Sequence, residues 1–254
     1  MNFKEKLKNC EQVLGTWITS PSVSSLDSIC SSELDFVILD QEHGSITSKE
    51  LLPLINTAKA RGVNTLVRPS HISKESIQHA LDQGANGIQV PNIENKSEAL
   101  KVVEFSKYPP IGTRGYSPFI PSSNYINNGI SWNENMNNNI ITGINVEGQE
   151  AIQNIEDILD IRELDVIFVG LFDLSKAMGI PGEVNHQKVI DKLKRVVKLC
   201  KEKHISIGTI ATSLEHMNFL IKLGVNFIVY MVDMNVLSQS YKLINESFKN
   251  YIKK

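Results

Sequence analysis

The most informative stretch of the chain is Phe36-Val37-Ile38-Leu39-Asp40-Gln41-Glu42-His43-Gly44. Its four consecutive apolar residues are typical of a strand that is buried on both faces of a parallel sheet. Two acids and a histidine follow directly, at the carboxyl end of that strand, where α/β proteins bind their ligands. The stretch therefore predicts a central strand with an ionisable site at its end.

The same pattern recurs along the chain. Strand-length apolar runs occupy residues 13–18, 36–39, 64–67, 87–90, 141–146, 166–169, 206–210 and 227–232. Helical spacing of apolar residues follows at 24–31, 48–61, 74–83, 96–107, 150–160, 189–203, 213–223 and 235–250. Eight strand-helix repeats predict an α/β fold, a closed (β/α)8 TIM barrel. An open doubly wound sheet is the alternative, but the glycine-rich turn of that fold does not follow the first strand, where Gly15-Thr16 runs into Trp17.

One segment interrupts these repeats. Residues 108–139 contain four prolines, and half of residues 124–139 are asparagine. Long irregular segments inside compact domains are usually functional loops, so we expect a loop insertion here, before the fifth strand. Because the rest of the sequence has no linker composition, we expect a single barrel domain over residues 1–254.

Charge and cysteine usage narrow the choice of partners. The 26 Lys and Arg residues nearly balance the 28 Asp and Glu residues, and the net charge is −2. This balance argues against binding to nucleic acid or to an acidic membrane surface. The three cysteines, Cys10, Cys30 and Cys200, form no CxxC pair, and no signal or membrane-spanning run is present. We therefore expect a cytoplasmic protein with no nucleic-acid or membrane partner.

Further ionisable residues end other strands. Arg68 follows the third strand, Glu147 the fifth, and Asp173 the sixth after a short connection. An arginine at a barrel mouth can bind a carboxylate, or it can form an ion pair with Asp40 or Glu42. Carboxylates on neighbouring strand ends can share Mg²⁺ or Mn²⁺, whereas the alternative is that Glu147 and Asp173 cap helices.

The motifs also resemble a known family, the class II pyruvate aldolases. These enzymes comprise the 4-hydroxy-2-oxoheptanedioate and 2-keto-3-deoxy-sugar-acid aldolases of the HpcH/HpaI aldolase/citrate lyase family. The matching motifs are Asp40-Gln41-Glu42-His43-Gly44, Leu66-Val67-Arg68, Leu81-Asp82-Gln83-Gly84-Ala85-Asn86-Gly87-Ile88, Tyr108-Pro109-Pro110-Ile111-Gly112-Thr113-Arg114-Gly115 and Gly170-Leu171-Phe172-Asp173-Leu174-Ser175. The resemblance implies a carbon–carbon lyase that reversibly cleaves a 4-hydroxy-2-oxo acid to pyruvate and an aldehyde through a metal-stabilised enolate.

The resemblance also implies a role for each matching residue. Glu147 and Asp173 would bind a divalent cation, with Mg²⁺, Mn²⁺ and Co²⁺ as the candidates. Arg68 would stabilise the enolate oxygen and His43 would act as the base. The remaining expected residues are those that contact the substrate, Arg68, Asn145, Phe172 and Asp173, and those that support the site, Asp40 and Glu42.

Asp82 matches a family residue that raises the basicity of the histidine, but its position raises a difficulty. It lies at the end of the helix predicted over 74–83, and helix ends face the bottom of a barrel, away from His43. We therefore expect a homo-oligomer, such as a hexamer, in which Asp82 reaches His43 of a neighbouring subunit.

Three departures from the family pattern leave the aldehyde open. Asn145 replaces a glutamine, Leu171 replaces a proline, and Ser122-Ser123 replaces an arginine-alanine pair. The polar segment 116–139 is expected to shape the aldehyde pocket together with Ile210, which suits a sugar-like aldehyde. Two alternatives remain: a related lyase or condensing enzyme that uses oxaloacetate or a coenzyme A thioester, and a barrel that binds keto acids without turnover.

Overall fold

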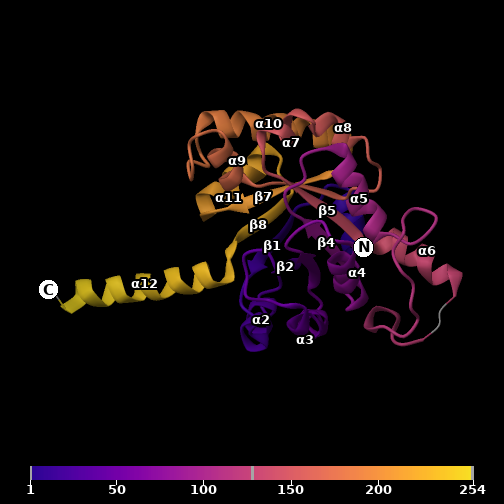
Figure 1. Ribbon diagram of the computed structural model, residues 1–254. Coiled ribbons are helices and arrows are strands. Elements are labelled where there is room, and N and C mark those ends of the chain that lie inside the picture. The colour runs from indigo at the N-terminus through magenta and orange to yellow at the C-terminus, as the bar shows by residue number, and fades with distance from the viewer. Residues whose placement is uncertain (1, 127–128, 253–254) are drawn as a thin grey trace.

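Eight parallel strands form a closed barrel in sequence order in the computed structural model, which describes residues 2–126 and 129–252 (Figure 1). The strands are β1 Val13–Ile18, β2 Phe36–Asp40, β3 Asn64–Arg68, β4 Gly87–Val90, β5 Ile141–Val146, β6 Val166–Val169, β7 Ser206–Ala211 and β8 Phe227–Val232. The predicted (β/α)8 barrel is confirmed. Strands β2, β3 and β7 each extend one residue beyond the predicted range.

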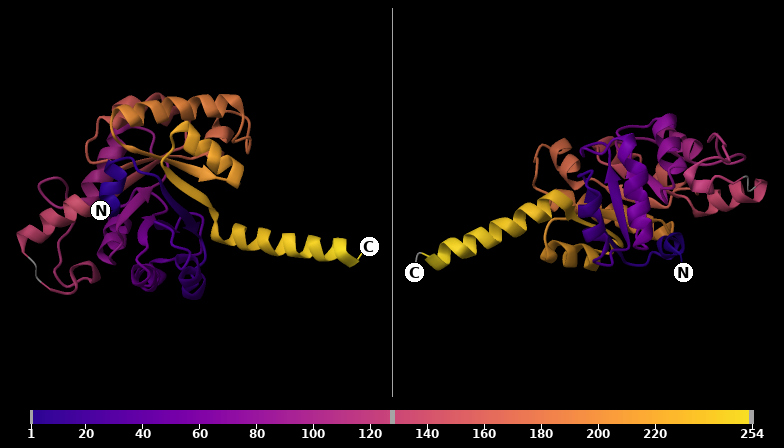
Figure 2. Two further views of the ribbon diagram at one scale, coloured as in Figure 1. Left: turned by 180° about the vertical axis from the view of Figure 1, so that it is seen from behind. Right: turned by 90° about the horizontal axis from the view of Figure 1, so that it is seen from below.

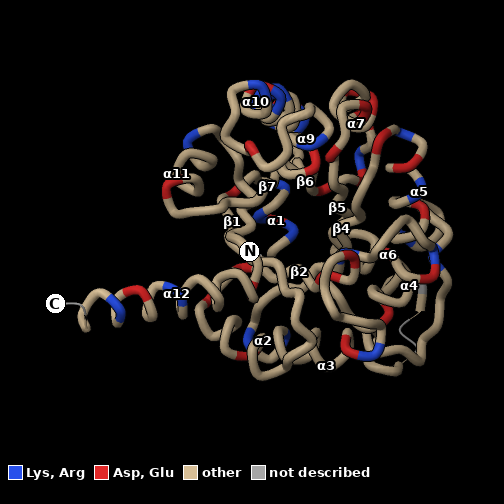
Figure 3. Tube along the Cα trace, turned by 60° about the vertical axis from the view of Figure 1, so that its left-hand side comes forward, with Lys and Arg blue, Asp and Glu red and all other residues tan. Residues whose placement is uncertain are grey.

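Helices surround the barrel. They include α2 Val23–Cys30, α3 Ser48–Ala60, α4 Lys74–Asp82, α5 Lys96–Ser106, α7 Gln149–Gln153, α8 Ile155–Leu159, α9 Leu171–Ala177, α10 Gln187–Glu202 and α11 Leu214–Leu223. The single helix expected over 150–160 is wrong, because the chain breaks at Asn154, whose side-chain amide donates to the Glu94 carbonyl at 3.0 Å. Helix α9 was not among the helices expected from apolar spacing, although a helix start was expected near Asp173. Acidic and basic residues are interspersed over the outer helices (Figure 3).

A short helix closes the lower end of the barrel. Helix α1 spans Phe3–Lys8 and begins with a capping box between Asn2 and Glu5. Its Phe3 and Leu7 side chains are buried, and Phe3 packs against Phe36 with ring centroids 5.6 Å apart. Six residues are too few for a readable helical period, so the sequence pattern did not indicate this helix.

The segment 108–139 is more regular than expected. It contains the 3₁₀ turn η1 Pro121–Ser123 and helix α6 Ile130–Asn139. Within α6, Asn137 is buried, and its side chain accepts from the Tyr108 backbone N–H at 2.7 Å and donates to the Tyr108 carbonyl at 3.0 Å. At least this asparagine of the polar tract therefore holds α6 against the backbone of Tyr108.

The interior of the barrel is packed with alternating large and small residues. Phe36 and Phe227 stack with ring centroids 4.1 Å apart. They fit because Gly15 and Gly208 lie opposite: an added Cβ would lie 2.6 Å from the Phe36 ring at Gly15 and 2.7 Å from the Phe227 ring at Gly208. A second apolar shell lies between the strands and the outer helices. Aromatic and aliphatic side chains therefore fill much of the lower interior.

The last helix, α12 Asp233–Ile252, does not join the outer ring. It extends away from the barrel in every view (Figures 1 and 2). Every residue from 234 to 252 is exposed. Within the described ranges, none of the helices combines the length and apolarity required to cross a membrane.

Candidate active site

The predicted ionisable residues of β2 and β3 meet at the upper end of the barrel. Asp40 and Arg68 are register partners on the two neighbouring strands. Arg68 donates to both oxygens of Asp40, from Nε to Oδ1 at 2.8 Å and from Nη2 to Oδ2 at 2.7 Å. Such a bidentate pair fixes the plane of the guanidinium as well as its position.

Two more side chains hold Arg68. Its Nη1 lies 3.1 Å from Glu42 Oε2, and its guanidinium carbon lies 4.0 Å from the centre of the Trp17 ring. The ion pair that the sequence left as an alternative is therefore present, with both acids. A guanidinium has five N–H donors, and these contacts use three of them. Two N–H groups thus remain for a ligand.

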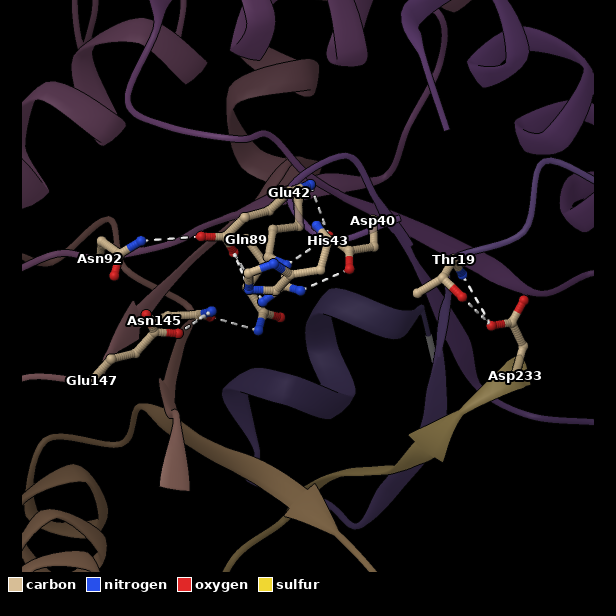
Figure 4. A network of polar contacts seen from close by, with 10 residues as sticks. Thr19, Asp40, Glu42, His43, Gln89, Asn92, Asn145, Glu147 and Asp233 are labelled. Carbon is tan, nitrogen blue, oxygen red and sulfur yellow. Dashed lines mark hydrogen bonds and ion pairs between the residues drawn. The ribbon is translucent and has the colours of Figure 1, made fainter. Parts of the chain in front are cut away.

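The loop after β2 depends on the same carboxylate. Asp40 Oδ1 accepts from the backbone N–H groups of Glu42 at 3.0 Å and His43 at 3.3 Å (Figure 4). Gly44 completes the turn, where an added Cβ would collide with the Asp40 carbonyl oxygen. The result is that the His43 side chain, which is 69% exposed, stands at the barrel mouth with Nε2 3.9 Å from Glu42 Oε2.

Glu42 links this loop to the next strand end. Its Oε1 accepts from the side-chain amide of Asn92 at 3.1 Å. Burial raises the pKa of the Glu42 carboxyl, and the nearby Asp40 carboxylate adds to the increase, while Arg68 and His43 oppose it. The negative charge of Glu42 is therefore disfavoured by burial, and Arg68 and His43 offset part of this effect.

Glu147 occupies the far side of the mouth at the end of a hydrogen-bonded chain. Gln89 Nε2 donates to Asn145 Oδ1 at 2.7 Å, and Asn145 Nδ2 donates to Glu147 Oε1 at 2.9 Å (Figure 4). Gln89 and Asn145 are fully buried. An added Cβ on Gly170 would lie 2.6 Å from Glu147 Cγ, so the carboxylate packs beneath the start of α9. Contact of Asn145 with the substrate stays a prediction, whereas its hold on Glu147 is direct.

The Glu147 carboxylate is electrostatically unfavourable by itself. Burial raises its pKa, and the carboxylates of Glu42 and Asp173 raise it further, against a hydrogen bond from Asn145 and the charge of Arg68. Asp173 lies in the first turn of α9, beside the exposed Phe172, with its side chain 52% exposed. The exposed Lys176 lies 3.7 Å from Asp173. Carboxylate oxygens that follow two neighbouring strands suit a hard divalent cation. Among the described residues, no group of three or more His, Cys, Asp or Glu side chains converges, so water and substrate would complete the coordination.

Asp82 lies at the other end of the barrel, as its place in the helix indicated. It is the last residue of α4, and its Oδ1 lies 2.6 Å from Nη2 of the buried Arg114. It is therefore separate from His43 of its own chain.

Three residues of the site were missed by sequence reasoning. Trp17 stacks on Arg68, Gln89 begins the chain of amides, and Asn92 holds Glu42. Gln89 carried a signal, because a polar residue in the middle of a buried strand needs a partner. Trp17 and Asn92 had none, since a tryptophan in a strand and an asparagine after one are ordinary core and turn residues.

The fold and the mouth define a (β/α)8-barrel enzyme whose site combines an arginine with several carboxylates. The sequence pattern of the HpcH/HpaI aldolase/citrate lyase family matches residues 14–240, and the chain belongs to that family. It is accordingly a carbon–carbon lyase.

Three relatives illustrate this membership. A 2-keto-3-deoxy-L-rhamnonate aldolase of Escherichia coli O6:K15:H31 is 26% identical over 238 residues, or 94% of this chain and 89% of that protein. The crystal structure of an HpcH/HpaI aldolase from Desulfitobacterium hafniense DCB-2 is 26% identical, with a TM-score of 0.92 and coverage of 98% and 97% of the two chains. The citrate synthase SbnG is 25% identical, with a TM-score of 0.89 and 99% of each chain covered.

The position of Glu147 predicts an unusual effect of its neutralisation. Because its pKa is raised in the folded state, Glu147 contributes stability below the ordinary pKa of a glutamate and loses it as the pH rises through the folded value. We expect Glu147→Gln to stabilise the metal-free protein increasingly as the pH rises above the ordinary pKa of a glutamate, which is about 4.3. Urea unfolding at several pH values measures this.

A matched control separates this effect from general charge removal. Glu150→Gln alters an exposed glutamate three residues away and should leave the pH profile of stability unchanged. Adding Mg²⁺ or Mn²⁺ should raise the melting temperature of the wild type more than that of Glu147→Gln. Equal profiles and equal metal responses in all three proteins would contradict the assignment.

Proposed function

We propose that the chain is a divalent-cation-dependent aldolase that cleaves a 4-hydroxy-2-oxo acid to pyruvate and an aldehyde. One observation carries the proposal. A guanidinium held in place with open N–H groups and a buried carboxylate with a raised pKa lie at the same mouth of the barrel. Arg68 supplies the first and Glu147 the second. Family membership supports the reaction class.

Each residue has a task in this reaction. Arg68, immobilised by Asp40 and Trp17, directs its two open N–H groups at oxygens that gain negative charge as the C3–C4 bond breaks. Glu147 and Asp173 would hold the cation, which supplies Lewis-acid stabilisation of the same charge when bound. Asn145 orients Glu147 through its hydrogen bond.

His43 is suited to move the proton. Its side chain is exposed at the mouth, while its backbone is held by Asp40. In the cleavage direction it takes the proton of the 4-hydroxyl group, and Glu42 at 3.9 Å stabilises the resulting imidazolium. The same histidine can then return a proton to the three-carbon product.

The substrate that we favour is a 2-keto-3-deoxy sugar acid. The 2-keto-3-deoxy-L-rhamnonate aldolase among the relatives supports a hydroxylated aldehyde. The polar segment 116–139 gives no such support, because Ser122 lies beside Gly84, next to the end of α4 at the lower end of the barrel. The expectation that this segment shapes the aldehyde pocket together with Ile210 is therefore wrong within one chain. A condensing or lyase reaction on oxaloacetate is the second candidate, and the similarity to a citrate synthase supports it. Binding of keto acids without turnover is the third candidate.

A coupled assay of pyruvate release tests the proposal. The purified chain is offered a panel of 4-hydroxy-2-oxo acids in parallel with oxaloacetate, with and without EDTA. We expect pyruvate release that EDTA abolishes and that Mg²⁺, Mn²⁺ or Co²⁺ restores. Activity that survives EDTA and is trapped by borohydride would indicate a lysine imine instead, and binding without release would indicate the non-catalytic barrel.

His43→Ala separates the roles of base and electrophile. Aldol cleavage requires removal of a hydroxyl proton, whereas decarboxylation of oxaloacetate does not. We expect kcat for cleavage to fall by about 10²–10⁴-fold, the range for loss of a general base. Oxaloacetate decarboxylation should fall much less. An equal loss in both reactions would remove His43 from the role of base.

We also propose that Asp82 completes the site of a neighbouring subunit in a homo-oligomer. Its own-chain position cannot serve His43, and among the described residues its Oδ2 has only a 3.5 Å contact with Gln78. A mixture of His43→Ala and Asp82→Asn chains, refolded together, tests this. Sites shared between subunits should recover about a quarter of the wild-type activity, since half of the chains supply each intact residue. Sites within one chain should recover none.

A further inference from the structure

The position of His43 at the mouth depends on its backbone. The imidazole is 69% exposed, and its ionic contact within the described chain is with Glu42 at 3.9 Å. Asp40 fixes the loop before the histidine through the backbone N–H groups of Glu42 and His43. A general base must come within about 2.6–3.2 Å of the atom whose proton it removes. The segment after His43 therefore needs a support of its own.

Thr19 provides this support from the neighbouring strand end. It directly follows β1, and its carbonyl oxygen accepts from the Ser45 N–H at 2.9 Å. Gly44 packs on the same backbone, because an added Cβ there would lie 3.0 Å from Thr19 Cα and 3.1 Å from the Thr19 carbonyl oxygen. The loop after β2 is therefore held between Asp40 on one side and Thr19 on the other.

Asp233 in turn fixes Thr19. It is the first residue of α12, and it is only 8% exposed. Its Oδ1 accepts from the Thr19 N–H at 3.1 Å and from the Thr19 hydroxyl at 2.7 Å (Figure 4). Its Oδ2 accepts from the Ser20 N–H at 3.2 Å, and the Met234 N–H donates to Oδ1 at 2.8 Å. Most of these donors therefore belong to residues 19 and 20 rather than to the helix.

The Asp233 carboxylate does more than cap a helix. A capping side chain needs one acceptor oxygen, and serine, threonine or asparagine supplies it without a charge. Within the described chain, the hydrogen-bond partners of Asp233 are backbone N–H groups and a hydroxyl. Hydrogen bonds to a carboxylate are about twice as strong as those between neutral groups. The buried charge therefore serves to hold residues 19 and 20 in place.

An irregularity in β8 precedes Asp233. The register with β1 shifts between Gly15 and Trp17, where β8 advances by three residues and β1 by two. Within this stretch of β8, Met231 adopts a left-handed backbone conformation with φ of 51°. Bulges beside active sites re-aim side chains, and a left-handed non-glycine residue persists only where its surroundings hold it. Regular pairing is thus lost immediately before the residue that holds Thr19.

We propose that Asp233 is a positioning residue for His43. It fixes Thr19, and Thr19 fixes the Gly44–Ser45 end of the loop, so the imidazole keeps its place at the mouth during proton transfer. This inference rests on the proposed function, in which His43 is the base. Arg68 has other supports, Asp40 and Trp17. Loss of the Asp233 carboxylate should therefore impair the step that needs His43 more than the step that needs Arg68.

Hydrogen exchange tests the hold on the loop without reference to catalysis. The proteins compared are the wild type, Asp233→Ala and the control Asp35→Ala. The control removes a carboxylate at the opposite end of β1, where Asp35 Oδ2 accepts from the Leu14 N–H at 3.0 Å. The peptide that contains Ser45 should exchange several-fold faster in Asp233→Ala and at the wild-type rate in the control. An unchanged rate in Asp233→Ala, or an equal increase in both variants, would overturn the inference.

Variants of Thr19 test the same route with a smaller change. Thr19→Val removes the hydroxyl that donates to Asp233 and keeps the carbonyl that Ser45 uses, whereas Thr19→Ser keeps both. A misplacement of 1 Å can cost about 100-fold in rate, so we expect Thr19→Val to lower kcat for aldol cleavage by about 10-fold. Oxaloacetate decarboxylation should fall less, and Thr19→Ser should retain the wild-type kcat. Equal losses in both reactions, or equal effects of valine and serine, would reduce the contact to a structural one and overturn the inference.

Failure of the proposed function would give a different result. A wild type that cleaves no 4-hydroxy-2-oxo acid would refute that function, and the exchange rates would still decide whether Asp233 holds the loop. A wild type that cleaves the acid, with the same kcat in Asp233→Ala, would refute the positioning role alone.

Discussion

The bidentate ion pair between Arg68 and Asp40 joins two strand ends where water has little access, with side chains 11% and 2% exposed. Neither charge is stable there without the other, because desolvation of a lone ion in such a position costs several kcal/mol. The same Asp40 carboxylate also accepts from the backbone of Glu42 and His43. One carboxylate thus sets the orientation of the arginine and the conformation of the loop that presents the histidine. Trp17 and the register of β2 with β3 complete this arrangement.

The rest of the mouth is organised by charge. Asp40 and Glu42 balance Arg68 on one side. On the other side the Asp173 carboxylate raises the pKa of the buried Glu147, and the exposed Lys176 lies 3.7 Å from Asp173. The buried amides of Gln89 and Asn145 supply geometry but no charge. In the proposed reaction, a cation would offset the negative charge of Glu147 and Asp173. The oxo acid would bring its negative oxygens to the open N–H groups of Arg68. The shortened side chain of Asn145 leaves that division intact.

The strands could be read from the sequence because continuous apolar runs have few alternatives, and Arg68 and Glu147 were found because they end such runs. Asp82 could be placed at the lower end from the direction of its helix alone. The partners of these residues were harder to predict. Gln89 meets Asn145 only once β4 and β5 pair, and Trp17 meets Arg68 only once the barrel closes. The course of α12 was also hidden, since an amphipathic pattern is the same whether the helix packs on its own barrel or on another. Thr19, which holds Asp233, also accepts from the Ser45 N–H at 2.9 Å, so this helix and the His43 loop share a support.

The lower end of the barrel is closed by the stacked rings of Phe36 and Phe227 and by Phe3 and Leu7 of α1. Everything that reaches the site must therefore enter and leave through the upper mouth. In the proposed reaction the oxo acid lies deeper, beside the buried Glu147, and the aldehyde lies nearer the exposed His43. A single entrance would then fix the order of binding and release. In cleavage the aldehyde would leave before pyruvate, and in synthesis pyruvate would bind before the aldehyde. In the proposed reaction, the aromatic floor of the barrel would thus set the kinetic order of a reaction at its opposite end.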